Sequence, residues 1–139
     1  MLRLVLDTNV VLDLFHFADP TASPILVAIE AGRACCFADA AGLVELTRVV
    51  AYPEFRMSAA DGAALMERYR GIAGLIEPGD VPKLPQCRDR DDQKFLELAM
   101  RSQADLLVSK DEALLKLKGR TNLPFRIVTP AAAVVLLTQ

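Results

Sequence analysis

The stretch that decides the fold opens the chain and reads Leu2-Arg3-Leu4-Val5-Leu6-Asp7-Thr8-Asn9-Val10-Val11-Leu12-Asp13. Residues 2–6 are a short apolar run of the kind that forms a strand buried on both faces. After Asp7-Thr8-Asn9, a second apolar run has the spacing of one face of a helix. The stretch therefore predicts a strand, a carboxylate at its end, a short turn and a helix.

The position of Asp7 supports two interpretations. Ligands bind at the carboxyl ends of the strands in an open parallel sheet, which makes Asp7 a candidate for chemistry. Aspartate and asparagine are also common helix N-caps, so an ordinary capping role is the alternative. The rest of the chain favours the chemical interpretation.

Short apolar runs and amphipathic stretches alternate beyond this point. Further strands are predicted at residues 33–38, 106–108 and 125–128. Helices are predicted after the turn at 19–24, after Asp39, from Ser58 to Ala73, over 95–100, around 114–117 and over 131–137. Prolines at positions 78, 82 and 85 predict an extended connection over 79–86. This order indicates an α/β protein with a mostly parallel sheet and helices on both faces.

The composition limits the classes of protein that this chain can be. Its 139 residues suffice for a single domain, expected to span residues 1–139, and hydrophobic residues make up 53% of it. The formal net charge of −2 gives no global attraction for nucleic acid, although an enzyme that holds its substrate through a metal does not need one. The three cysteines have no zinc-site spacing, and their odd number predicts a reduced chain. We see no leader and no apolar run of membrane length, so we expect a cytoplasmic protein without membrane association.

A second informative stretch, residues 87–100, reads Cys-Arg-Asp-Arg-Asp-Asp-Gln-Lys-Phe-Leu-Glu-Leu-Ala-Met. Its apolar residues predict a largely buried helix, and Asp89, Asp91 and Asp92 precede that helix. Carboxylates crowded at one helix start repel one another, and the helix dipole offsets only about 0.3–1 kcal/mol per charge. A bound divalent cation would relieve the repulsion better. The alternative is a solvated, charged turn in which arginines alternate with the aspartates.

Two further carboxylates stand in informative positions. Asp111 follows the short predicted strand 106–108, as Asp7 follows the first strand. Glu45 lies in a predicted helix between apolar neighbours, which favours a pocket over the exposed position usual for a helix glutamate. A nearby basic cluster is either a solvated helix end or a contact for a phosphate backbone, and it consists of Lys116, Lys118 and Arg120.

These carboxylates converge if the strands share one carboxyl edge, and the acids concerned are Asp7, Glu45, Asp92 and Asp111. Carboxylates without cysteine or histidine partners favour Mg²⁺ or Mn²⁺, and such a site suits phosphodiester hydrolysis. No glycine-rich phosphate loop follows the first strand, so Rossmann and P-loop interpretations lack their residues. The single histidine, His16, has no second ligand type nearby and is expected to have a structural role.

Three stretches of the chain resemble the PIN-domain family. They are Leu-Asp7-Thr8-Asn9-Val, Arg88-Asp-Arg-Asp-Asp92-Gln-Lys-Phe-Leu and Ala104-Asp-Leu-Leu-Val-Ser109-Lys-Asp111. Within the family they are most similar to the VapC-related toxin components of toxin–antitoxin systems, and the resemblance covers essentially the whole chain. It implies a three-layer α/β/α sandwich with a central, mostly parallel sheet and a metal-dependent ribonuclease activity.

The resemblance also implies a set of acidic site residues. The four acidic positions of the family fall on Asp7, Glu45, Asp92 and Asp111, as metal ligands and catalytic residues. The choice of Asp92 rests on its spacing to the apolar residues that follow, and Asp89 or Asp91 can replace or assist it.

Three polar residues next to these acids are expected on the substrate side. The resemblance implies that Asn9 fixes the first loop and that Ser109 lies beside the metal. Lys110 stands where the family often has glycine or arginine, and we expect it to contact substrate.

The predicted function is therefore a Mg²⁺- or Mn²⁺-dependent endoribonuclease that hydrolyses RNA, the toxin of a type II toxin–antitoxin pair. A toxin implies a small antitoxin partner, and the family implies a homodimer. Two alternatives stay open: a PIN-fold binding module with weak or lost catalysis, and a nuclease or phosphatase acting on a substrate other than RNA.

Overall fold

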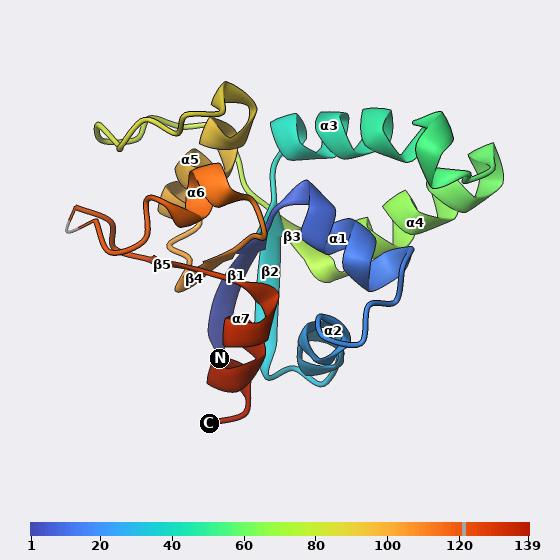
Figure 1. Ribbon diagram of the computed structural model, residues 1–139, viewed down its shortest axis with the longest axis horizontal. Coiled ribbons are helices and arrows are strands. Elements are labelled where there is room, and N and C mark those ends of the chain that lie inside the picture. The colour runs from blue at the N-terminus through green and yellow to red at the C-terminus, as the bar shows by residue number, and fades with distance from the viewer. Residues whose placement is uncertain (121) are drawn as a thin grey trace.

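The computed structural model describes residues 1–120 and 122–139, and within them the chain forms a five-stranded, all-parallel sheet of order β3-β2-β1-β4-β5 (Figure 1). The strands are β1 (Leu2–Leu6), β2 (Ala34–Ala38), β3 (Ala73–Leu75), β4 (Leu106–Val108) and β5 (Arg126–Val128). The first strand of the chain is central, with β2 on one side and β4 on the other. The apolar run at residues 4–6 is explained by this position, since it is buried on both faces of the sheet, whereas Arg3 is only half-buried.

Seven α-helices and two short 3₁₀ helices surround the sheet in the described part of the chain. The α-helices are α1 (Thr8–Phe15), α2 (Ser23–Glu30), α3 (Ala40–Val50), α4 (Ala59–Ile72), α5 (Gln93–Arg101), α6 (Glu112–Leu115) and α7 (Pro130–Leu137). The 3₁₀ helices are η1 (Pro53–Phe55) and η2 (Arg90–Asp92). Among these same residues, no helix is both long and apolar enough to cross a membrane.

The two faces of the sheet pack against different helices. Leu4 and Leu6 of β1 belong to an apolar core with α1, α2, α3, α4 and α7, whereas Val5 faces a second core with α5 and α6. Figure 1 shows α5 and α6 on one side of the sheet and α1 and α2 on the other. Alternation of side chains along each strand thus produces two cores. The predicted three-layer α/β/α sandwich with a parallel sheet is confirmed.

The edge strand β3 was not predicted, and Ala73 was wrongly assigned to the preceding helix. Its backbone is extended (φ −94°, ψ 131°), and it pairs with Cys36 of β2. Helix α4 passes into β3 without an intervening turn, and the two glycines near the boundary, Gly71 and Gly74, lie inside these elements and do not mark a turn. The strand reads Ala-Gly-Leu, a composition with little strand propensity, and pairing with β2 decides its conformation.

Candidate metal centre

An acidic cleft of about 200 Å³ lies at the carboxyl end of the central strands. It is lined by Asp7, Thr8, Asn9, Glu45, Val49, Asp89, Asp91, Asp92, Phe95 and Asp111. These side chains come from the start of α1, from α3, from η2 and α5, and from the loop between β4 and α6. The parallel topology gathers them because it brings the carboxyl ends of β1 and β4 to one edge of the sheet. The cleft includes all four acids proposed from the sequence.

Asp7 is both a helix cap and a wall of the cleft. One oxygen, Oδ1, accepts a hydrogen bond from the backbone N–H of Val10 at 3.0 Å, which caps α1. The other, Oδ2, accepts a hydrogen bond from the Ser109 hydroxyl. Burial raises the pKa of Asp7 to about 6, although the hydrogen bonds from Ser109 and Val10 act in the opposite direction. The capping interpretation of Asp7 is confirmed, and its position in the cleft leaves the chemical interpretation as a prediction.

Ser109 joins the ends of β1 and β4. Its hydroxyl donates to Asp7 and accepts a hydrogen bond from the backbone N–H of Asp111 at 2.9 Å. Asp111 in turn caps α6, since its Oδ1 accepts from the N–H of Ala113 at 2.8 Å. The fully buried serine thus links the carboxylate of Asp7 to the backbone of Asp111.

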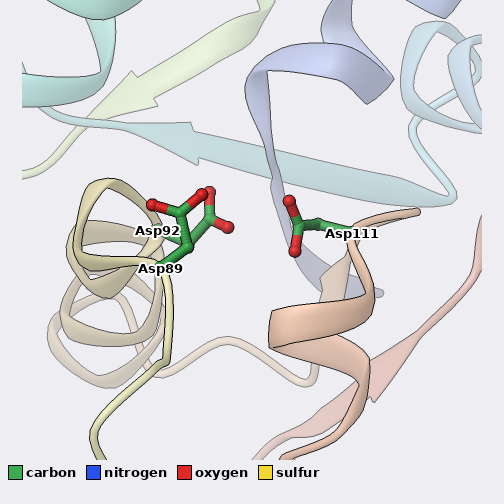
Figure 2. A group of neighbouring side chains, drawn as sticks. All are labelled: Asp89, Asp92 and Asp111. Carbon is green, nitrogen blue, oxygen red and sulfur yellow. The ribbon is translucent and has the colours of Figure 1, made fainter.

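Three carboxylates face one another across the cleft. Oxygen atoms of Asp89, Asp92 and Asp111 all lie within 4.8 Å of one another (Figure 2). Burial, together with the nearby charges of Asp111 and Asp89, raises the pKa of Asp92 to about 7. The Oδ2 atom of Asp92 is buried and has no hydrogen-bond partner among the described residues. Asp92 and its neighbour Asp89 therefore share this part of the cleft, as the sequence left open.

This donor set fits a divalent cation. Like charges held this close destabilise one another, and a buried carboxylate oxygen without a partner is costly. A hard cation that prefers oxygen ligands removes both costs at once, which is the chemistry of Mg²⁺ and Mn²⁺. The residues whose atoms meet this requirement are Asp89, Asp92 and Asp111.

Glu45 lines the same cleft, but both of its oxygens already have partners. Its Oε1 atom lies 2.8 Å from Nζ of Lys94, and its Oε2 atom accepts a hydrogen bond from the hydroxyl of Thr8. The Lys94 ammonium also donates to the backbone carbonyl of Asp91. Thr8 and Lys94 were missed in the sequence analysis, because their partner is 37 and 49 residues away along the chain.

The remaining polar candidates differ in position. Asn9 is exposed and lines the cleft. Lys110 instead directs its ammonium group to the buried carboxylate of Asp13, with Nζ 2.6 Å from Oδ2.

His16 packs edge-on against Phe17 with ring centroids 4.6 Å apart, a packing contact of the structural kind expected. The basic residues of the α6 end, Lys116, Lys118 and Arg120, are exposed and do not line the cleft.

Fold and cleft together define an α/β/α protein with a cluster of acidic residues at the carboxyl edge of its parallel sheet. The sequence model of the PIN domain matches residues 3–113, from β1 into α6, and the chain belongs to the PIN-domain family. The PIN domain is a nuclease-type fold, and the matched residues include every acid of the cleft. No curated protein and no solved structure gives a significant match to the chain.

Proposed function

We propose that the protein is a Mg²⁺- or Mn²⁺-dependent endoribonuclease that hydrolyses RNA phosphodiester bonds. One observation carries the proposal: carboxylates of Asp89, Asp92 and Asp111 meet within 4.8 Å in a PIN domain, with a buried Asp92 oxygen left without a partner. The acidic cleft by itself repels a polyanion, so RNA requires a cation there to approach these carboxylates.

Asp92 and Asp111 would hold the cation, with Asp89 at the exposed side and Asp7 at the buried side. The chemistry that a divalent cation supplies in such a place is activation of water and stabilisation of charge on the phosphate. Ser109 keeps Asp7 and Asp111 in register, through the hydrogen bonds that it makes to both. Preorganised ligands of this kind lower the cost of arranging the site during the reaction.

Other side chains of the cleft adjust its charge. Lys94 balances Glu45, so that part of the negative charge is compensated before any cation binds. Its ammonium is also close enough to the cleft wall to offer positive charge to a substrate phosphate. Asn9, exposed at the cleft edge, contributes an amide that can donate to RNA.

We further propose that this single-domain chain acts in the cytoplasm as the toxin of a toxin–antitoxin pair. The support is the similarity of its three acidic motifs to the toxin branch of the family. A small antitoxin that covers the cleft with an arginine would satisfy the carboxylates as a cation does. Light scattering of the purified chain, alone and with the product of an adjacent gene, tests the homodimer and the antitoxin.

Cleavage of a structured RNA pool by purified protein, in Mg²⁺, Mn²⁺ or EDTA, tests the nuclease. We expect cutting in the metal buffers and none in EDTA. Asp7→Asn and Asp111→Asn should lower the rate about 100-fold or more, as expected when charged groups of a catalytic site are neutralised. Asp61→Asn, on the exposed start of α4, is the matched control and should cut normally.

Two results would contradict the proposal. Full metal-dependent cutting by Asp111→Asn would exclude the assigned site. Turnover of phosphate monoesters or DNA with no cutting of RNA would exclude the substrate and favour the other phosphate chemistry.

A further inference from the structure

Helix α3 leads away from the candidate metal centre with one distinctive face. Glu45, Arg48, Val49 and Tyr52 follow the spacing i, i+3, i+4, i+7, so they share one side of the helix. Tyr52 lies two residues beyond Val50, the last residue of α3, but its N–H still bonds to the carbonyl of Val49 at 3.0 Å. We call these four residues the α3 stripe. The first and third line the acidic cleft, so the stripe is continuous with the proposed catalytic site.

Arg48 carries the positive charge of this stripe. It is fully exposed, and its guanidinium lies beside the Tyr52 hydroxyl, a polar contact that raises the pKa of Arg48. Arg48 lies one helical turn beyond Glu45, which lines the cleft, so it is near the cleft. Arginine binds phosphate with a planar, two-pronged set of donors, and it keeps its charge at any physiological pH.

Tyr52 supplies an exposed aromatic surface that its neighbours hold in place. Its side chain is 37% exposed, and its ring lies nearly parallel to that of Phe55, at 9° with centroids 6.4 Å apart. Phe55 packs edge-on against Phe17, at 67° and 6.0 Å. A ring that is already fixed loses little conformational freedom when a base stacks on it.

We propose that the α3 stripe is a binding subsite for single-stranded RNA leaving the catalytic cleft, where Arg48 binds a backbone phosphate and Tyr52 stacks on a base. Proteins that bind single strands combine cationic groups that follow the backbone with aromatic rings for the bases. The subsite rests on the proposed ribonuclease function. RNA is favoured over a protein partner because the cation and the ring continue the line of the cleft.

The helix also sets the distance between the cleft and the aromatic ring. Seven residues from Glu45 to Tyr52 correspond to about 10 Å along a helix. A stacked strand advances about 3.4 Å per nucleotide, so the subsite lies roughly three nucleotides from the scissile bond. A dinucleotide bound at the cleft is too short to reach Tyr52, whereas an octanucleotide can span both.

The test is fluorescence anisotropy in Mg²⁺ with a labelled single-stranded octaribonucleotide and a dinucleotide, both with non-hydrolysable linkages, so that the carboxylates of the cleft stay unchanged. Tyr52→Ala should weaken octamer binding about 5- to 150-fold, the range for loss of one stacked base, and leave dinucleotide binding unchanged. Tyr52→Phe, which keeps the ring, should bind normally. Arg48→Ala should reduce the slope of log affinity against log salt by about 0.7, the value for one phosphate on a single strand.

Arg70→Ala is the matched charge control. Arg70 is exposed on α4 and lines a different cavity, so its loss lowers the net charge equally without touching the subsite. Kinetics of octamer cleavage in the otherwise unchanged protein give a second readout. Tyr52→Ala should raise KM and leave kcat nearly unchanged, because the ring lies away from the reacting phosphate.

Three outcomes overturn the subsite. In the first, Tyr52→Ala and Arg48→Ala change neither the affinity for the octamer nor KM. If such a protein still cuts RNA in Mg²⁺, only the subsite is excluded and the ribonuclease proposal is kept. In the second, neither anisotropy nor cleavage kinetics detects any binding of the octamer. In the third, Tyr52→Ala changes the oligomeric state of the protein but keeps its affinity for RNA, which would assign the Tyr52 ring to a protein contact. Conversely, Tyr52-dependent binding by a protein that cuts no RNA would support the subsite and exclude the proposed catalysis.

Discussion

At the scale of single residues, Asp7 shows how one side chain serves structure and chemistry together. It caps α1 through Val10, and this bond fixes one oxygen while the second meets Ser109 at the cleft. The cap explains why the carboxylate points in a defined direction. Burial explains its raised pKa, since a charge removed from water is harder to form. The same burial makes the ionised residue a liability for stability when no cation is bound.

The first prediction follows from this liability. The pKa of Asp7 is 3.8 in the unfolded chain and about 6 in the folded protein, so the folded state binds the proton more tightly. The cost of ionising Asp7 is therefore absent below about pH 4, grows as the pH rises and is complete above about pH 6. Asparagine keeps the cap and carries no charge. In EDTA at pH 7.5, we expect Asp7→Asn to be more stable than the natural protein by about 2–3 kcal/mol.

Urea unfolding of both proteins at pH 4 and pH 7.5 measures the difference. The gap should shrink to a small part of its size at pH 4, where Asp7 is protonated in the folded protein and partly protonated in the unfolded chain. Asp61→Asn, at an exposed position of α4, should show no such gap at either pH. Equal stabilities of Asp7→Asn and the natural protein at pH 7.5 would contradict the argument.

At the scale of elements, the contact between α3 and α5 sets the charge of the cleft. Lys94 of α5 reaches Glu45 of α3, and the side chains are 21% and 14% exposed, so water screens the pair only in part. This contact places a fixed positive charge beside a site that we propose to bind a divalent cation. Two like charges in one cleft oppose each other.

The second prediction is therefore that Lys94→Met strengthens Mg²⁺ binding and weakens RNA cleavage. Removing the ammonium frees Glu45 and takes away a positive charge, which should lower the Kd for Mg²⁺ about 3- to 10-fold. RNA loses a positive contact in the same step, so kcat/KM should fall. Calorimetric titration with Mg²⁺ and cleavage kinetics measure the two effects. Lys83→Met, in the exposed connection before η2, should change neither. Weaker Mg²⁺ binding by Lys94→Met would contradict the charge argument.

The elements also show how far sequence reasoning reaches. Strands β1, β2, β4 and β5 were predicted because each is a local apolar run, and Asp7 and Asp111 followed from being at strand ends. Strand β3 was missed because its conformation depends on pairing with β2, not on its own residues. Periodicity carries no information on contacts between distant side chains.

The ion pairs of the site are contacts of this distant kind. Lys94 and Glu45 are 49 residues apart, and the local sequence around either residue does not predict the other as its partner. Asp13, on the buried side of α1, pairs with Lys110 of the β4–α6 loop, at a position where the sequence suggested a substrate contact for the lysine. The acids could thus be predicted from position, whereas the partners that hold and balance them required the folded chain.

At the scale of the whole molecule, two apolar cores hold the sheet, and the acidic cleft lies at its carboxyl edge. The cores stabilise the fold through burial of aliphatic side chains, which does not depend on pH. The cleft destabilises the fold in a pH-dependent way, because it concentrates ionisable groups whose repulsion grows as they lose protons. A natural protein tolerates such a cost when the same groups bind a ligand.

The third prediction concerns this balance. A ligand that binds only the folded state stabilises it, by about 2.7 kcal/mol at a concentration 100 times its Kd. Mg²⁺ should therefore raise the melting temperature, and EDTA should reverse the effect. Protons compete with the cation for Asp7 and Asp92, whose pKa values of about 6 and about 7 lie close to neutrality. The Mg²⁺-induced shift should therefore be large at pH 8 and small at pH 5.

Thermal unfolding of the natural protein, Asp111→Asn and Asp61→Asn, with Mg²⁺ or with EDTA at both pH values, measures this dependence. Asp111→Asn removes one of the three converging carboxylates, so its Mg²⁺-induced shift should fall sharply, while Asp61→Asn should keep the full shift. NaCl at equal ionic strength separates specific binding from screening, since screening needs no particular geometry. A shift of the same size in Asp111→Asn, or one that does not change between pH 5 and pH 8, would mean that Mg²⁺ stabilises the protein elsewhere. The carboxylates of the cleft would then need another positively charged partner, and the arginine of a bound protein is the chemical group that best replaces the cation.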